Sequence, residues 1–143
     1  MSAFFFKKDI IQINKLNLEK LRTAAKDAPL RRARFCLHQG SEDIVQEMLI
    51  AFCKNSIVPV HRHKNKTESF HIIEGFIRVL FYNDNYEMIN QFKMGPIESG
   101  LPFIYRLSNS MWHTIEILSD FAILHETTSG PFVEDEMEVL QPK

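Results

Sequence analysis

The chain has 143 residues, of which 45% are hydrophobic and 24% charged, as expected for one globular domain. Its formal net charge of −1 gives no reason to expect nucleic acid or an anionic membrane as a partner. No apolar run approaches the roughly 18 residues of a membrane span, and the Phe-rich start is too short for a signal-peptide core. Cys36 and Cys53 cannot build a disulfide framework and lie in apolar sequence, which indicates reduced thiols in a cytoplasmic protein.

The N-terminal part predicts an arm followed by a helix. Residues 1–16 are expected to form an arm or short strand, whose phenylalanines pack against the body or against a second subunit. Asn17 is a candidate N-cap for a helix over residues 17–28, which carries leucine and alanine at three- and four-residue spacing. Pro29 ends that helix.

From there to about residue 133, short apolar runs alternate with turn residues and predict strands. The expected strands are 33–38, 47–52, 61–63, 70–73, 76–82, 86–92, 103–107, 112–118 and 121–126. Glu74 and Gly75 have the character of a hairpin turn, and residues 134–143 that of a solvated acidic tail. The pattern predicts one all-β domain, 17–133, built as a sandwich or barrel with one N-terminal helix.

The stretch from Pro59 to Gly75 carries a candidate metal site. His61 and His63 are one residue apart, so in a strand both side chains point to the same face. A four-residue spacer leads to Glu68, whose carboxylate can return beside the imidazoles through a tight loop. Two imidazoles and a carboxylate suit a divalent first-row metal, and His113, on a distant strand, would supply a fourth ligand.

These residues resemble the first motif of the cupins. The spacing H-x-H, four residues, Glu, six residues, Gly is met by His61, His63, Glu68 and Gly75. His113 is similar to the histidine of the second cupin motif. The resemblance implies a double-stranded β-helix barrel, or jelly roll, in whose mouth the three histidines and the glutamate converge on one metal ion.

The match to both motifs is incomplete. The first motif usually opens with a glycine where Asn55 stands, and asparagine tolerates the same left-handed backbone. In the second motif, Ser108 and Ser110 replace the usual proline and glycine, and Ile117 replaces the usual asparagine.

A narrower resemblance covers the chain from the helix to Phe132. In order, the matching blocks are RRARFCLH, QEMLIAF, HRHKNKTESFHIIEG, FIYRL, WHT and ETTSGPF. They resemble the WbuC-type cupin-fold metalloproteins, a family associated with bacterial O-antigen and surface-polysaccharide gene clusters. The resemblance implies the fold and the metal site, and leaves the reaction unassigned.

Other side chains are candidates for substrate contact or proton transfer. Arg31, Arg32 and Arg34 could contact an anionic substrate group, with Arg34 favoured because it shares a strand face with His38. Lys66, in the loop before Glu68, could reach over the metal. Solvated basic residues are the alternative for all of them. His38 and Tyr105 could act as acid or base, and each could equally be a structural residue. His71 has the opposite strand parity to Glu68 and is expected to point away from the metal. One of His125 and Glu126 must face the barrel, and parity leaves open which one.

The leading hypothesis is a cytoplasmic cupin with one divalent metal, either zinc, iron, manganese or nickel, acting on a small sugar or nucleotide sugar. The metal would serve as a Lewis acid for an isomerase or epimerase. Iron-dependent oxygenation and a non-catalytic metal- or sugar-binding module are the alternatives. A homodimer is expected, because the Phe-rich arm and the edges of a small barrel both need cover.

Overall fold

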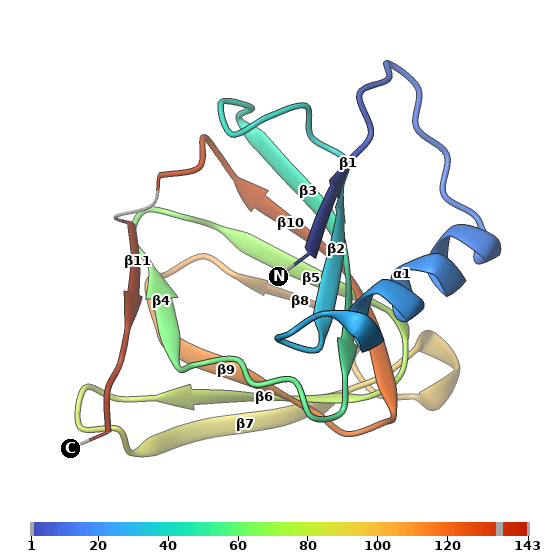
Figure 1. The fold of residues 1–143 in the computed structure, drawn as a ribbon. Helices are drawn as coiled ribbons and strands as arrows, with labels where there is room; N and C mark the ends of the chain where they lie inside the picture. Colours follow the sequence, from blue (N-terminus) through green and yellow to red (C-terminus); the bar gives the residue numbers. More distant parts are fainter. Residues whose placement is uncertain (1, 134–135, 143) are drawn as a thin grey trace.

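The computed structural model describes residues 2–133 and 136–142, and within them the fold is two β-sheets that face each other (Figure 1). The first sheet has the strand order β1-β2-β3-β10-β5-β8 and the second the order β11-β4-β9-β6-β7. The strands are β1 (Ser2–Phe5), β2 (Arg32–Cys36), β3 (Val45–Cys53), β4 (His61–His63), β5 (Glu68–Glu74), β6 (Ile77–Tyr82), β7 (Met88–Met94), β8 (Ile104–Leu107), β9 (Trp112–Ile117), β10 (Phe121–Ser129) and β11 (Met137–Val139). The helix is α1 (Lys15–Asp27), and a short 3₁₀ turn, η1, spans Ile97–Ser99. The predicted jelly-roll β fold with an N-terminal helix is confirmed.

The core lies on both faces of the first sheet, and strand alternation decides which side chain goes where. In β3, Met48, Ile50 and Phe52 belong to the core between the two sheets. The residues between them, such as Leu49 and Ala51, belong to a second core under α1. A strand buried on both faces is expected to read as a continuous apolar run, as β3 does.

Helix α1 covers the outer face of the first sheet (Figure 1), where Leu21 and Ala25 are fully buried. It begins earlier than the sequence predicts. Asn14 is the N-cap, and its side chain and that of Asn17 each bond the other residue's backbone N–H in a capping box. Asn17 is therefore the third helical residue rather than the cap. No helix in the described part of the chain is long and apolar enough to cross a membrane.

Both ends of the chain add a strand. β1 pairs in parallel with β2, and Phe4 and Phe6 pack edge-on against Phe35. The arm therefore packs against the body of the domain, which is one of the two arrangements that the sequence predicts. Within the expected acidic tail, residues 134–143, the structure forms a strand, since β11 pairs with β4. Glu138 in β11 forms ion pairs with Arg62 and Lys64 of that strand. Residues 134–135 and 143 of the predicted tail lie outside the described residues.

The turn at Gly75 connects the two sheets and is not a hairpin, contrary to the sequence prediction. β5, which precedes it, lies in the first sheet, whereas β6, which follows it, lies in the second. Gly75 has a φ of +81°, and a Cβ on it would collide with the backbone oxygen of Phe121 and lie 2.6 Å from the Ser119 hydroxyl. Only glycine fits both the backbone angle and the space at this crossing.

Candidate metal centre and its cavity

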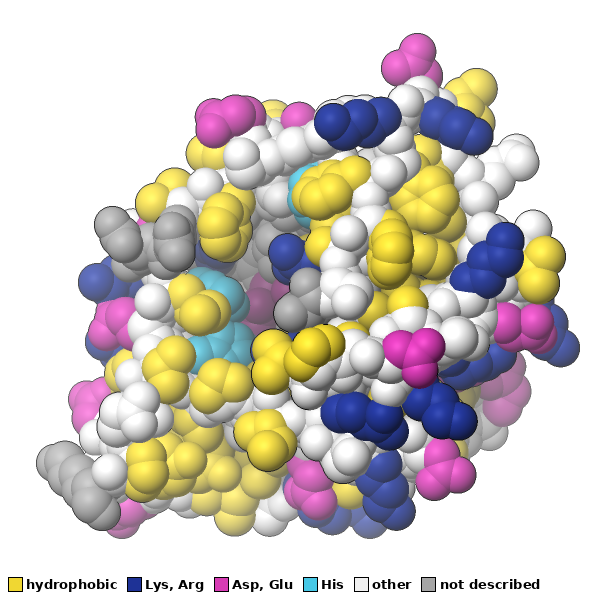
Figure 2. Space-filling model, in the orientation of Figure 1, with side chains coloured by type: hydrophobic (Ala, Val, Ile, Leu, Met, Phe, Trp, Pro, Cys, Tyr) yellow, Lys and Arg dark blue, Asp and Glu magenta, His cyan; other side chains and the backbone are white. Residues whose placement is uncertain are grey.

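A cavity of about 430 Å³ lies between the two sheets and is lined by His61, His63, Glu68 and His113. Figure 2 shows it as a hollow in which histidine side chains lie near the surface, with basic and acidic atoms deeper inside. Both sheets contribute to its wall, since β4 and β9 belong to the second sheet and β5 to the first.

The strand pairing brings the four candidate ligands together. His61 of β4 lies opposite His113 of β9 in the register of the second sheet, and their ring centroids are 4.5 Å apart. The His63 ring centroid is 5.0 Å from that of His61 and 6.3 Å from that of His113. Glu68 reaches across from β5, with Oε1 2.7 Å from Nε2 of His113 and Oε2 3.7 Å from Nε2 of His63.

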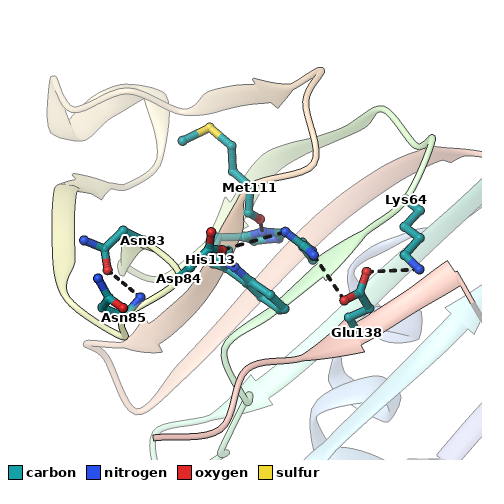
Figure 3. Close-up of polar contacts among 9 residues, drawn as sticks. Lys64, Asn83, Asp84, Asn85, Met111, His113 and Glu138 are labelled. Atoms are coloured by element: carbon teal, nitrogen blue, oxygen red, sulfur yellow. Dashed lines mark hydrogen bonds and ion pairs between the residues drawn. The ribbon is translucent and has the colours of Figure 1, made fainter. Parts of the chain in front are cut away.

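Two of these histidines have their protonation fixed by the backbone. Nδ1 of His61 lies 2.9 Å from the carbonyl oxygen of Pro59. Nδ1 of His113 lies 2.8 Å from the carbonyl oxygen of Met111, and Figure 3 shows these two residues. Because a carbonyl oxygen can only accept, each Nδ1 must carry the proton. In the neutral ring, Nε2 then presents its lone pair, which is the arrangement that outer hydrogen bonds give to metal-binding histidines.

Glu68 and His113 are in contact and buried, but the two atoms that face each other have no well-aligned hydrogen bond among the described residues. Glu68 is 3% exposed and His113 is 2% exposed. Although Oε1 and Nε2 are only 2.7 Å apart, neither atom makes an aligned hydrogen bond within the described residues. Two acceptor atoms facing each other in a buried site need a cation between them, either a proton or a metal ion.

The donor atoms are therefore of the kinds that bind a divalent transition metal, but the side chains are not arranged around one common point. In the described ranges, no three His, Cys, Asp or Glu side chains are positioned as a ready metal-holding group. Three imidazoles with at least two lone pairs directed inward, next to one buried carboxylate, are the ligand types that such metals prefer.

Burial and neighbouring charges shift the pKa values of this cluster in opposite directions. Burial, and then the nearby His113, lowers the pKa of His61 to about 4. Burial also lowers the pKa of His63. Burial alone would raise the pKa of Glu68 and lower that of His113, but their mutual contact outweighs it, so Glu68 is lowered and His113 is raised. The cluster thus favours an ionised glutamate beside neutral His61 and His63.

We expect metal-free protein to lose stability as the pH falls from 6.5 to about 4, and His61 to cause part of that loss. A group with a lowered pKa in the folded state stabilises the fold above its unfolded pKa, here near 6.5, and that contribution disappears as the pH falls through the folded value. His113, whose pKa is raised, acts in the opposite sense and loses its contribution as the pH rises.

Urea unfolding in EDTA across this pH range checks the expectation. The His61→Ala variant should lose stability less steeply than the wild type between pH 6.5 and pH 4. Parallel pH profiles for the two proteins would contradict it.

The remaining candidates lie in different surroundings. Arg34 and Lys66 line the cavity. His38 is not part of its wall, since it lies beyond the end of β2, where Nδ1 faces the backbone of Glu47 and the ring packs against Phe5. Tyr105 packs in the core against Phe70, beside the cavity rather than on its wall.

The structure shows which of the adjacent residues His125 and Glu126 faces the interior of the barrel. Glu126 lines the cavity, whereas His125 is on the outer face of the first sheet, with Nε2 2.8 Å from a carboxylate oxygen of Glu47. His71 lies beside His125 on that outer face, as its parity predicts. Arg32, one of the three arginines expected as possible contacts for an anionic substrate, also lines the cavity as the first residue of β2.

Solved structures similar to this chain share the cupin fold. CapF of Staphylococcus aureus, a capsular polysaccharide assembling protein, is 18% identical with a TM-score of 0.61, over 77% of this chain and 31% of its own. The Cnp3 cupin domain of Schizosaccharomyces pombe is 17% identical with a TM-score of 0.55, and the match covers 69% of this chain and 64% of that domain. Oxalate decarboxylase of Bacillus subtilis, which has Mn(II) centres, is 15% identical with a TM-score of 0.54, and the match covers 68% of this chain and 24% of the decarboxylase.

The fold is thus that of a cupin, and the chain spans less than two thirds of each of these structures. By sequence, it belongs to the family described as "Domain of unknown function (DUF6016)", whose model matches residues 13–94. That range includes the first three candidate ligands and ends before His113. No curated protein matches the chain.

Proposed function

We propose that the chain is a metal-binding cupin of the WbuC type and that His61, His63, Glu68 and His113 hold one divalent transition metal. The observation that supports this most strongly is the pair of backbone carbonyls that keep the proton on Nδ1 of His61 and His113. In the neutral rings both Nε2 atoms would then offer a lone pair to a cation beside the buried Glu68 carboxylate. Zinc, iron, manganese and nickel all accept this ligand set.

The chemistry we propose is isomerisation or epimerisation of a small, sugar-related metabolite. A bound metal would polarise a carbonyl or hydroxyl group of the ligand. Glu126, on the cavity wall, is suited to move the proton, because burial and the charge of Glu68 raise its pKa to about 8 against the opposing effect of Arg34 and Lys66. The structural likeness to CapF and the resemblance to polysaccharide-cluster cupins support a sugar substrate.

Two measurements test this function against its alternatives. Incubation with a panel of sugar phosphates and nucleotide sugars, followed by NMR, should show proton exchange or a changed stereocentre that depends on added metal. Oxygen consumption with iron would instead indicate an oxygenase. Binding of the panel without any conversion would overturn the enzyme proposal and indicate a binding module.

The setting and assembly of the protein are further proposals. The two cysteines are free and buried, which supports a reducing compartment such as the cytoplasm. Phe4 and Phe5 remain 45% and 48% exposed on the edge strand β1, which supports a homodimer that covers them. Light scattering should give the mass of two chains, and a monomer at all concentrations would refute the dimer.

A further inference from the structure

Strand β2 directs two arginines into the cavity from the sheet that faces the histidines. Arg32 and Arg34 line the cavity, while Ala33 and Phe35 between and beyond them are buried under α1. Residues two apart on a strand project from the same face roughly 7 Å apart. His61 and His63 lie on the opposite sheet, so a ligand between the sheets could contact both groups.

Among the described residues, these two guanidinium groups have no oxygen partner, unlike the other arginines. Nε of Arg32 and Nε of Arg34 are buried without a hydrogen-bond partner in the described part of the chain. Nη1 of Arg34 has Sδ of Met48, at 3.6 Å, as its one acceptor within residues 2–133 and 136–142, and a thioether is a weak acceptor. Neither arginine forms an ion pair with a described residue. By contrast, the arginines outside the cavity contact oxygen atoms of a neighbour: Arg22 with Glu74, Arg31 with Asn55, Arg62 with Glu138, Arg78 with Glu116 and Arg106 with Ser108.

Arg32 and Arg34 are half-buried. Partial burial of a cation without a partner is unfavourable, and two cations on one strand face also repel each other. Lys66 adds a third cationic side chain to the wall, against the carboxylates of Glu68 and Glu126. The cavity wall is therefore positive even if both carboxylates are ionised, and a divalent metal would increase that charge. An anionic group from a ligand would satisfy the guanidinium donors and offset the repulsion.

We infer that the cavity binds a small anionic ligand, with a carboxylate or phosphoryl group held by Arg32 and Arg34 and the rest of the molecule directed toward the histidines. This rests on the proposed function, because it names the ligand class of the same cavity. A volume of about 430 Å³ lies toward the small end of the range for ligand sites, which suits an acidic or phosphorylated monosaccharide. A neutral sugar could accept hydrogen bonds through its hydroxyl groups but would leave both guanidinium groups without a negative charge beside them.

The test compares four probes on zinc-loaded full-length protein by isothermal titration calorimetry: inorganic phosphate, glucose 6-phosphate, glucuronate and glucose. The wild type should bind at least one anionic sugar at least tenfold more tightly than glucose, and the better of the two identifies the group as phosphoryl or carboxylate. Arg32→Gln/Arg34→Gln should weaken that binding about tenfold to a hundredfold with zinc content unchanged. Arg78→Gln removes a cation outside the cavity and should leave the affinity unchanged.

The thermal unfolding midpoint shows whether the double variant is folded. If it is not, Arg32→Lys/Arg34→Lys replaces it, since lysine keeps the charge but loses the paired donors and should still weaken binding. Unchanged affinity in a folded arginine variant, equal affinity for glucose, or no binding of either anionic sugar would overturn the inference. Arginine-dependent anion binding by a protein that takes up no metal would refute the proposed function and leave the inference standing.

Discussion

Replacing His61 and His63 together by alanine is expected to lower the affinity for divalent metal by at least about a hundredfold. Loss of an outer partner of a ligand already costs about ten- to a hundredfold, and here two inner ligands are removed. The barrel should stay folded, because both rings line the cavity and neither belongs to the main core. Competition against a metal-indicator dye measures the affinity, and circular dichroism checks the fold.

The matched control removes two histidines from the outer face of the barrel. His71→Ala/His125→Ala also deletes a neighbouring pair of strand histidines, but neither ring lines the cavity. That variant should bind metal as the wild type does. Metal at one hundred times the wild-type dissociation constant should also stabilise wild type and control by about 2.7 kcal/mol, and the His61/His63 variant by no more than about 0.4 kcal/mol. Equal metal affinity in all three proteins would rule out this site.

Gly75→Ala is expected to destabilise the fold by about 3 kcal/mol or more, at the high end for a single substitution. The turn between the two sheets requires a φ of +81° there, which costs an L residue about 1–2 kcal/mol. The added methyl group would also collide with the Ser119 hydroxyl and with the backbone carbonyl of Phe121. The Phe121 carbonyl cannot easily move, because Phe121 is the first residue of β10. Urea unfolding measures the loss.

Gly100→Ala separates the two causes. Gly100 has nearly the same backbone angle, a φ of +79°, yet a Cβ on it would meet no atom within 4 Å. Gly100→Ala should therefore lower the free energy of unfolding only by the cost of a positive φ for an L residue, about 1–2 kcal/mol. Equal losses at both positions would show that the crowded crossing at Gly75 contributes nothing beyond its backbone angle.

The sequence predicted the local content of the barrel well, because a strand repeats every two residues and its pattern is visible without a structure. The shared face of His61 and His63 and the outward direction of His71 follow from that period alone. The N-cap was placed three residues late because two asparagines, at positions 14 and 17, occupy both ends of one capping box.

Pairing between distant strands was harder to predict, because the sequence pattern gives a strand's period and leaves its partner and register open. The choice between His125 and Glu126 needed the register of β10 against β3 and β5. The inter-sheet role of Gly75 and the pairing of β11 with β4 needed the partner strands as well. The basic run made Arg32 a possible anion contact, but its direction into the cavity required the start of β2, whose first residue it is.

Elemental analysis of protein purified without a histidine tag shows whether the cavity holds a metal. We expect about one divalent transition-metal ion per chain, either as isolated or after incubation with metal and dialysis. EDTA should remove it, and the His61/His63 variant should lack it. A chain that retains no zinc, iron, manganese or nickel after such loading would contradict the proposed metal centre.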